Sequence, residues 1–395
     1  MGEHIALGLG NNTDYEIKWN SRVFERYISE LGITRSELNA NIAIASVRDL
    51  IVSILGFMAS GSGGERFVNT AEIVETFAKR FENKITIGGT SVRAAIAMRK
   101  LGYRSALHLV TMNDSVRRLI PADSSWVCSN QNDSVYPHLI VQFTPGTEVR
   151  AGDIYIAATR ANRIIYNNDL DNTILELNPK FAGLISDARV LLISGFNAMR
   201  DGSLLADRLR TLKQIMTSLP RDAIVYYEDA CFHIAEFSVQ VREALIESIN
   251  IYSLNEDELQ HYVGRQISLL DPGSVGQALR DVQRLLPVQL IVVHTRYWAL
   301  AYGDRACDYE EALKGGIAMA TTRLRLGDDF TEGDYRETTR LPLEREGIAF
   351  AEKLQASLGN IVCCLPSRQV SQSNVTTIGL GDAFVGGFLP ALDRE

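Results

Sequence analysis

The motif Gly379-Leu380-Gly381-Asp382 combines two flexible residues with one carboxylate and precedes an apolar stretch, residues 383–389. We predict a glycine-rich turn that opens a helix. Such a turn exposes backbone N–H groups at the positive end of the helix dipole, where an anion can bind. Asp382 would lie beside that anion and could accept a proton from a hydroxyl group attacking a phosphoryl group. The alternative is structural, because Asp is also a preferred N-cap residue.

Other glycine patterns do not indicate a nucleotide-binding motif. Gly8-Leu9-Gly10 follows a predicted strand but lacks the third glycine of a Rossmann fingerprint. No lysine follows a glycine, so the P-loop pattern is absent. The chain has 30 glycines in 395 residues, and random placement alone gives about two Gly-x-Gly patterns. The motif at Gly379 is therefore informative only through its position before a helix.

The elements that must position this motif follow a regular alternation. Short apolar segments rich in β-branched residues alternate with longer segments of helical periodicity, which predicts parallel βα units. The predicted strands are residues 5–9, 85–87, 105–110, 189–194, 223–227, 249–253, 289–294 and 360–365. The predicted helices include residues 91–101, 203–219, 237–248 and 272–286. We expect an α/β core in which helices cover both faces of a mostly parallel sheet.

Two stretches interrupt this alternation and predict a second, smaller unit. Residues 16–79 contain helical patterns and the Gly/Ser loop 60–64, and residues 131–184 contain the predicted strands 138–143 and 154–158. We predict that these two stretches form an inserted α/β lid. The core would then comprise residues 1–15, 80–130 and 185–395.

Composition excludes several classes of protein. A net charge of −8 and a pI near 5.4 argue against sequence-independent nucleic-acid binding, which needs a basic face. The sequence shows neither a long apolar span nor a secretory signal, so we expect a cytoplasmic protein without a membrane partner. Five cysteines without a Cys-x-x-Cys pair favour neither a zinc site nor a disulfide framework. No residue pattern indicates the oligomeric state.

The Gly379–Asp382 motif, preceded by Thr377, resembles the signature of the ribokinase-like superfamily. Residues 226–230 (Tyr-Tyr-Glu-Asp-Ala) and 253–259 (Ser-Leu-Asn-Glu-Asp-Glu-Leu) are similar to the H-x-E and N-x-x-E motifs of the ADP-dependent glucokinase and phosphofructokinase family. Further segments resemble that family in the same order along the chain: residues 138–143, 161–165, 192–197 and 293–295. The resemblance extends from about residue 5 to residue 389. It implies a ribokinase-like core, a sugar or sugar-phosphate substrate, ADP as phosphoryl donor, and Mg²⁺.

The same resemblance implies roles for individual residues. The catalytic set would be Asp382 as general base, Gly379 and Gly381 in the anion-binding turn, and Arg163 as a lid cation that reaches the transferring phosphate. The sugar would contact Asn12, Asp14, Glu65, Gly88, Gly89 and Asn197. The nucleotide would contact His294, Thr295 and Leu380. Glu228, Asn255 and Glu258 would hold Mg²⁺ largely through its water ligands.

Each of these roles has a simpler structural alternative. Asn12 and Asp14 suit turns, and Asn197 suits a helix cap. Glu258 would otherwise be a solvated helix residue, and His294 a core residue at the end of a strand. Arg163 would otherwise form a salt bridge to Asp169 or Asp171.

The chain also departs from the family pattern. Tyr226 stands where the family usually has histidine, Thr90 where it often has glutamine, and the usual proline is missing from residues 373–377. We predict an ADP-dependent sugar kinase. The alternatives are a non-catalytic sugar- or nucleotide-binding regulator and an ATP-dependent sugar kinase. Arg93 and Arg368 near the predicted pocket slightly favour a phosphorylated hexose over glucose.

Overall fold

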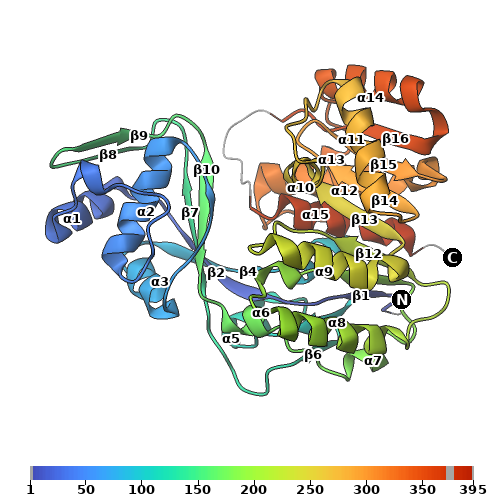
Figure 1. Cartoon of the computed structure of the whole chain (residues 1–395), viewed down its shortest axis with the longest axis horizontal. Helices are drawn as coiled ribbons and strands as arrows, with labels where there is room; N and C mark the ends of the chain where they lie inside the picture. Colours follow the sequence, from blue (N-terminus) through green and yellow to red (C-terminus); the bar gives the residue numbers. More distant parts are fainter. Residues whose placement is uncertain (1–2, 371–377, 394–395) are drawn as a thin grey trace.

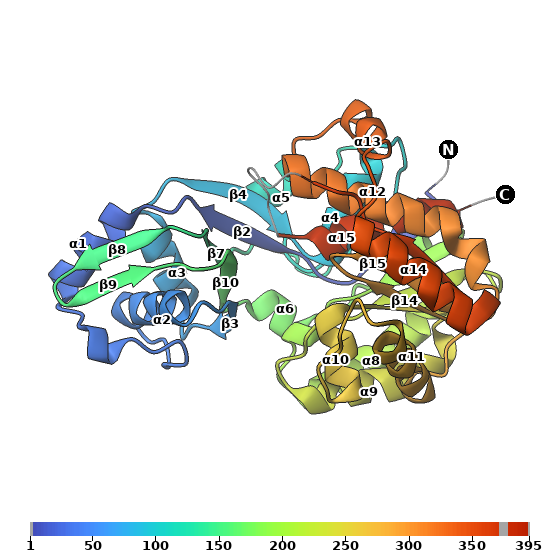
Figure 2. The same cartoon turned by 90° about the horizontal axis from the view of Figure 1, so that it is seen from above.

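Two β-sheets, each with its own helices, divide the chain into a larger and a smaller part (Figure 1). The computed structural model describes residues 3–370 and 378–393. Seen from above, the two parts lie side by side along the long axis, and both chain ends belong to the larger part (Figure 2). Within the described residues, no helix combines the length and the apolar character needed to cross a lipid bilayer.

The larger sheet has the strand order β16-β15-β14-β13-β12-β11-β1-β5-β6. The strands are β1 (Ile5–Leu7), β5 (Ala106–Leu109), β6 (Trp126–Cys128), β11 (Val190–Ile193), β12 (Ile224–Glu228), β13 (Ile251–Asn255), β14 (Leu290–His294), β15 (Trp298–Gly303) and β16 (Val362–Pro366). All neighbouring pairs are parallel except those that β15 makes with β14 and β16. The expectation of a mostly parallel sheet is confirmed. Sequence analysis did not predict strands β6 and β15.

Helices cover both faces of this sheet. One face packs against α7 (Phe181–Leu184), α8 (Gly202–Met216), α9 (Ala235–Leu245), α10 (Glu256–Val263), α11 (Pro272–Leu285) and α14 (Arg345–Leu358). The other face packs against α4 (Thr90–Arg99), α5 (Asp114–Leu119), α12 (Glu310–Leu326) and α15 (Leu380–Phe388). A further helix, α13 (Glu332–Thr338), contacts α12. The three-layer α/β architecture is therefore as predicted.

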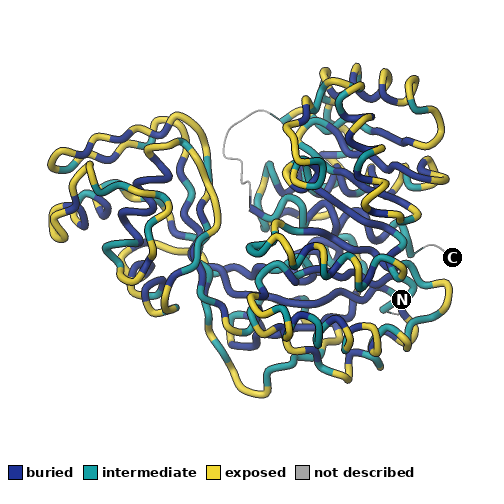
Figure 3. The backbone as a smooth tube through the Cα atoms, in the orientation of Figure 1, coloured by how far each residue is buried: buried dark blue, intermediate teal, exposed yellow. Residues whose placement is uncertain are grey.

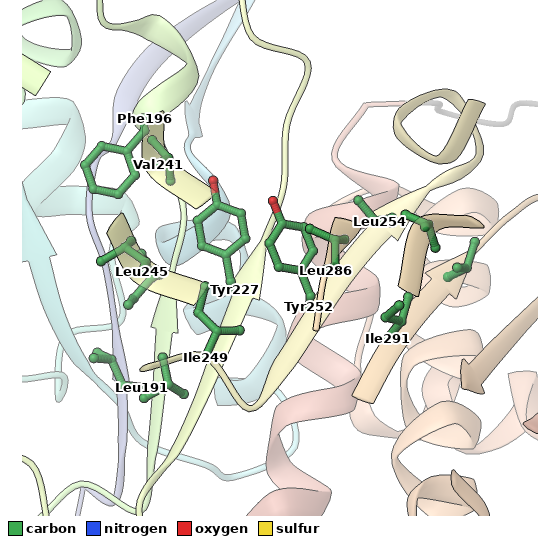
Figure 4. Close-up of a cluster of buried hydrophobic side chains, with 14 of the residues drawn as sticks. Leu191, Phe196, Tyr227, Val241, Leu245, Ile249, Tyr252, Leu254, Leu286 and Ile291 are labelled. Atoms are coloured by element: carbon green, nitrogen blue, oxygen red, sulfur yellow. The ribbon is translucent and has the colours of Figure 1, made fainter. Parts of the chain in front are cut away.

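Alternation along the strands explains this arrangement. In β11, Leu191 and Ile193 belong to the first hydrophobic cluster, whereas Val190 and Leu192 belong to the second. A strand buried on both faces is apolar throughout, as parallel strands between helices usually are. Figure 3 shows these central strands as buried, with exposed residues on the outer helices. Figure 4 shows the first cluster, in which the rings of Tyr227 and Tyr252 lie 4.8 Å apart.

The smaller sheet has the order β3-β10-β7-β2-β4. Its strands are β2 (Asn12–Ile17), β3 (Gly64–Phe67), β4 (Asn83–Gly88), β7 (His138–Phe143) and β10 (Asn162–Asn167). Helices α1 (Ser21–Leu31), α2 (Val47–Ser60) and α3 (Ala71–Ala78) cover the face that points away from the larger part (Figure 1). The hairpin of β8 (Glu148–Ala151) and β9 (Ile154–Ala157) packs at the edge of these helices, and α6 (Leu170–Ile174) follows β10.

One predicted strand belongs to a different sheet than expected. Residues 85–87 were expected in the parallel core, but they lie in β4, which pairs antiparallel with β2 in the smaller sheet. An apolar pattern of three residues indicates a strand but not its partner, and that is why the assignment was wrong. Because β2 and β4 pair with each other in the smaller sheet, we propose that both strands belong to the lid.

Candidate active site

A cavity of about 240 Å³ lies between the two parts. From the larger part it is lined by loops that follow β1, β11 and β12 and by the start of α15. From the smaller part it is lined by the sheet face opposite helices α1–α3. Ligands of open α/β sheets bind at the carboxyl ends of the strands, so this cavity is the candidate active site.

Nine of the residues predicted for catalysis or sugar binding line this cavity. They are Asn12, Asp14, Glu65, Gly88, Gly89, Arg163, Asn197, Gly379 and Asp382. They come from separate elements, which the fold brings together. Thr90, where the chain departs from the family pattern, also lines the cavity.

The strand period of two explains how the smaller sheet contributes. In β2, Tyr15 and Ile17 pack against the helices, so Asn12 and Asp14 face the other way, toward the cavity. The Asn12 amide donates a hydrogen bond to Asp14 Oδ1 at 2.6 Å. A side chain at Gly88 would collide with Asn12. Gly89 has a φ of 96°, which favours glycine.

Helix α15 places Asp382 at the opposite side of the cavity. Its N-cap is Gly379, with a φ of 61°, so no side chain caps the first-turn N–H groups. Two glycines further along let the helix approach its neighbours: a Cβ on Gly386 would lie 2.9 Å from the carbonyl oxygen of Ala94 in α4, and Gly387 meets the backbone of Gly315 in α12. This close packing fixes the start of α15 at the cavity.

A buried arginine joins these two sides. The Arg93 side chain is 5% exposed, and its Nη2 donates a hydrogen bond to Asp14 Oδ2 at 2.8 Å. Its Nε lies 3.7 Å from Asp382 Oδ2, and its Nη2 lies 3.9 Å from Glu16 Oε1. Burial by itself lowers the pKa of Arg93, but Asp14, Asp382 and Glu16 outweigh it and the pKa is raised.

Glu65 reaches the cavity from β3. About one third of its side chain is exposed, because it opens toward the cavity. Its Oε1 accepts a hydrogen bond from the Asn167 amide at 2.7 Å and lies 3.6 Å from His233 Nε2. Burial raises the pKa of Glu65, but His233 and the other neighbours more than compensate, so the pKa is lowered. Glu65 is thus held as a carboxylate.

Sequence analysis missed a histidine that lines the cavity. His138 begins β7 and is paired in register with Asp14 of β2. Its Nε2 lies 3.1 Å from Asp169 Oδ2. Burial lowers the pKa of His138, but Asp169, Asp14 and Glu65 raise it overall. The available signal was a histidine directly before the apolar residues Leu139, Ile140 and Val141 of the strand.

The residues predicted for metal and nucleotide binding lie beside the cavity, at the ends of β12, β13 and β14. Glu228 Oε1 lies 3.0 Å from His294 Nε2, and the Tyr226 hydroxyl lies 3.4 Å from Glu228 Oε2. Asn255 caps α10, and its backbone N–H donates to Glu258 Oε2 at 2.8 Å. Burial, with Asp229 and Glu228 nearby, raises the pKa of Glu258 well above its usual range.

Gly381 links this group to the anion-binding turn. A Cβ on Gly381 would lie 3.4 Å from Cε1 of His294 and 3.9 Å from Oε1 of Glu228. Leu380 begins the same helix. Thr295 lies in the turn between β14 and β15, where its hydroxyl donates to the carbonyl oxygen of Trp298 at 2.9 Å.

Two further expectations concern Arg368 and the segment that precedes Gly379. Arg368 donates a hydrogen bond to the carbonyl oxygen of Leu341 at 2.8 Å and does not line the cavity that Arg93 borders. The described residues therefore do not show the second anion site expected from these two arginines. Thr377 and the segment without proline lie outside the described residues.

The three-layer core, the covering lid and the cavity at the strand ends together define a ribokinase-like sugar-kinase fold. Residues 3–389 match the family described as ADP-specific phosphofructokinase/glucokinase conserved region. The chain belongs to this family of ADP-dependent sugar kinases. No curated protein matches the chain significantly in sequence.

Solved structures share the fold over nearly the whole chain. A phosphofructokinase from Pyrococcus horikoshii OT3 with AMP has a TM-score of 0.78 and 17% identity, covering 100% of this chain and 99% of its own. The last common ancestor of ADP-dependent phosphofructokinases from Methanosarcinales has a TM-score of 0.70 and 14% identity, covering 99% and 93%. An ADP-dependent kinase in complex with fructose 6-phosphate and ADPβS has a TM-score of 0.69 and 13% identity, covering 98% and 93%.

Proposed function

We propose that this protein transfers a phosphoryl group from ADP to a hydroxyl group of a hexose bound between its two parts. The observation that carries this proposal is that one cavity is lined both by the polar face of the smaller sheet and by Gly379 and Asp382 of α15. A bound hydroxyl group and a bound phosphate would meet there.

The proposed chemistry assigns a separate task to each side of the cavity. Asn12, Asp14 and Glu65 bind the sugar hydroxyl groups, because carboxylate and amide oxygens accept their hydrogen bonds. Asp382 takes the proton from the attacking hydroxyl group. The N–H groups at the start of α15, with Arg163 from the smaller sheet, stabilise negative charge on the transferring phosphoryl group.

Magnesium fits the carboxylates beside this cavity. Glu228, Asp229 and Glu258 are buried near one another, and the pKa values of Asp229 and Glu258 are raised by burial and mutual repulsion. A cation would relieve that repulsion. No three His, Cys, Asp or Glu side chains in the described parts of the chain form a direct metal site, so we propose that Glu228, Asn255 and Glu258 hold Mg²⁺ through water. When bound, Mg²⁺ neutralises charge on the phosphates.

The carboxylate of Glu65 favours a neutral hexose over a hexose phosphate. Arg93 is engaged by Asp14 and Asp382, and the carboxylate of Glu65 opens into the same space. A second phosphate group would be repelled by Glu65. This reverses the slight preference that the sequence suggested, since that preference depended on Arg93 and Arg368 together.

We propose that the smaller part closes further onto the larger part when sugar and nucleotide bind, starting from a contact that already exists. Phe67 of the smaller sheet packs against two residues of the larger part: its ring centroid lies 4.4 Å from that of His233 and 3.1 Å from Cζ of Arg200. Closure excludes water that would otherwise hydrolyse the donor. We expect small-angle scattering to show compaction on adding sugar and nucleotide, and an unchanged radius of gyration at saturation would contradict closure.

The function is tested by measuring product formation for glucose, fructose 6-phosphate and other hexoses with ADP or ATP as donor and Mg²⁺ present. We expect the highest kcat/KM for a neutral hexose with ADP. A higher kcat/KM with ATP would favour the ATP-dependent alternative. Binding of sugar and nucleotide without any transfer would favour the non-catalytic regulator.

A further inference from the structure

Arg93 occupies an unusual position, because it is buried and faces three carboxylates from two different elements. Asp14 and Glu16 come from β2, whereas Asp382 comes from α15. Arginine is rarely buried unless it is paired. Its own helix, α4, begins directly after Gly89 at the cavity wall.

Different nitrogens of the same guanidinium group serve the two sides. Nη2 donates to Asp14 Oδ2 at 2.8 Å, and Nε lies 3.7 Å from Asp382 Oδ2. Because the guanidinium group is planar and rigid, the hydrogen bond to Asp14 orients the same group that forms the ion pair with Asp382. Asp14 is also held through its other oxygen by Asn12. Any shift of Asp14 is therefore transmitted through Arg93 toward Asp382.

The glycine turn leaves space for this arginine. A Cβ on Gly379 would lie 2.9 Å from Nη1 and 3.0 Å from Cδ of Arg93, closer than real Cβ contacts occur. Arg93 thus packs directly under the turn that precedes Asp382. A second buried arginine supports the same turn from α12, since Arg323 Nε donates to the carbonyl oxygen of Ile378 at 2.7 Å. Among the described residues, Arg323 forms its ion pair with Asp328 and none with Asp14 or Asp382.

We propose that Arg93 is a positioning residue that ties the sugar-binding carboxylate of Asp14 to Asp382, so that sugar and proton acceptor are held in register. The proposal rests on the proposed function, in which Asp382 accepts the proton. It assigns Arg93 no contact with a substrate phosphate. Misplacing reacting groups by about 1 Å can cost about 100-fold in rate. Loss of Arg93 should therefore lower kcat more than it weakens nucleotide binding.

The test compares Arg93→Met, Asp382→Asn and the double variant by kcat, by KM for sugar and ADP, and by thermal unfolding. We expect Arg93→Met to lower kcat about 10- to 100-fold while KM for ADP changes less than about two-fold. In the Asp382→Asn background, the same change should lower kcat less than about two-fold, because the group that Arg93 positions no longer accepts a proton. Arg99→Met, on the exposed side of the same helix and paired with Asp123, is the matched control and should leave kcat unchanged.

Arg93→Lys decides the question if Arg93→Met does not fold. Lysine keeps the positive charge but offers a single nitrogen, which cannot serve Asp14 and Asp382 together. We expect it to restore folding with kcat still at least about five-fold below that of the wild type. A kcat within two-fold of wild type for either Arg93 variant, or an equal loss in the Asp382→Asn background, would overturn the proposal. Near-normal activity of Asp382→Asn itself would instead show that Asp382 is not the proton acceptor, which overturns this inference but not the phosphoryl transfer; absence of product with any sugar and donor would overturn the proposed function.

Discussion

Two clusters of carboxylates lie in and beside the candidate active site, and they differ in the cations that face them. Around Arg93, Asp14, Glu16 and Asp382 share one arginine at 2.8–3.9 Å. Beside the cavity, Glu228, Asp229 and Glu258 form no ion pair with Lys or Arg among the described residues. His294 faces Glu228. Asp229 accepts hydrogen bonds from a backbone N–H and a tyrosine hydroxyl group, and Glu258 accepts one from a backbone N–H.

The difference appears in the pKa values. In the second cluster, burial raises the pKa of Asp229 to about 6, and burial together with Asp229 and Glu228 raises that of Glu258 well above its usual range. Burial lowers the pKa of His294, but Glu228 raises it overall. The first cluster contains a cation of its own, Arg93, which pairs with all three carboxylates. Within the described residues, the second has no Lys or Arg partner and only His294 as a cation, which suits a site that receives a metal ion together with its nucleotide.

The largest effect is expected in the cluster around Arg93. Asp382→Asn keeps the size of the side chain but removes its ability to accept a proton, so kcat should fall about 10²- to 10⁴-fold. The thermal unfolding temperature should change little, because an amide can still occupy the first turn of α15. Steady-state kinetics with the preferred sugar measure the effect. A kcat near that of the wild type would show that Asp382 is not the proton acceptor.

The next effect belongs to the cluster without an arginine. Glu258→Gln and Glu228→Gln should each raise the Mg²⁺ concentration for half-maximal rate about 10-fold, because a neutral amide attracts a hard cation less than a carboxylate. Mn²⁺ binding followed by water proton relaxation in the presence of ADP gives a readout that does not depend on turnover. Asp257→Asn, an exposed change on the same helix, is the control. Unchanged metal titrations in both glutamate variants would exclude this site.

A smaller effect should appear in the pH dependence of stability without metal. Asp229 has an ordinary pKa of 3.8 that is raised to about 6 in the folded protein, so the folded state binds more protons between these values. Its contribution to stability is therefore lost as pH rises from about 4 to about 6. Asp229→Asn removes this loss. The unfolding temperature of the variant minus that of the wild type should therefore increase by about 2–4 °C as pH rises over that range.

The variant must be compared with the wild type because His108 changes the stability of both proteins in the opposite direction over the same pH range. Burial lowers the pKa of His108 from 6.5 to about 4, so its contribution is lost as pH falls through the same range. His108 is present in both proteins, and its effect cancels in the difference. A difference in unfolding temperature that stays constant from pH 4 to pH 7 would contradict the raised pKa of Asp229.

The sequence predicted the fold class and nine of the residues that line the cavity, because the strand patterns and motifs behind these predictions are local. Strands 189–194 and 289–294 are apolar on both faces, and parallel strands bring the residues that follow them to one edge of the sheet. Asn197 and Asp382 could therefore be expected near one another. The six residues of β15 are all buried, and their apolar sequence is likewise typical of a strand between two layers of helices.

The balance of the two clusters could not be predicted from the sequence. Arg93 looks like any helix arginine, and its role depends on Asp14 and Asp382, which come from β2 and α15. Likewise, Asp229 and Glu258 become crowded only when β12 and β13 lie side by side. Charge balance in a buried site is a property of tertiary contacts, whereas a motif records only what is near in the chain.

The smallest effect should come from Glu16, the most distant partner of Arg93. Glu16 Oε1 lies 3.9 Å from Arg93 Nη2 and accepts a hydrogen bond from the Thr86 hydroxyl at 2.6 Å. Glu16→Gln keeps an oxygen for Thr86 and removes one charge, while the arginine keeps its closer contacts with Asp14 and Asp382. We expect kcat to change less than about three-fold. A loss of kcat as large as that of Arg93→Met would mean that the total negative charge around the arginine, and not its link between Asp14 and Asp382, sets the position of the proton acceptor.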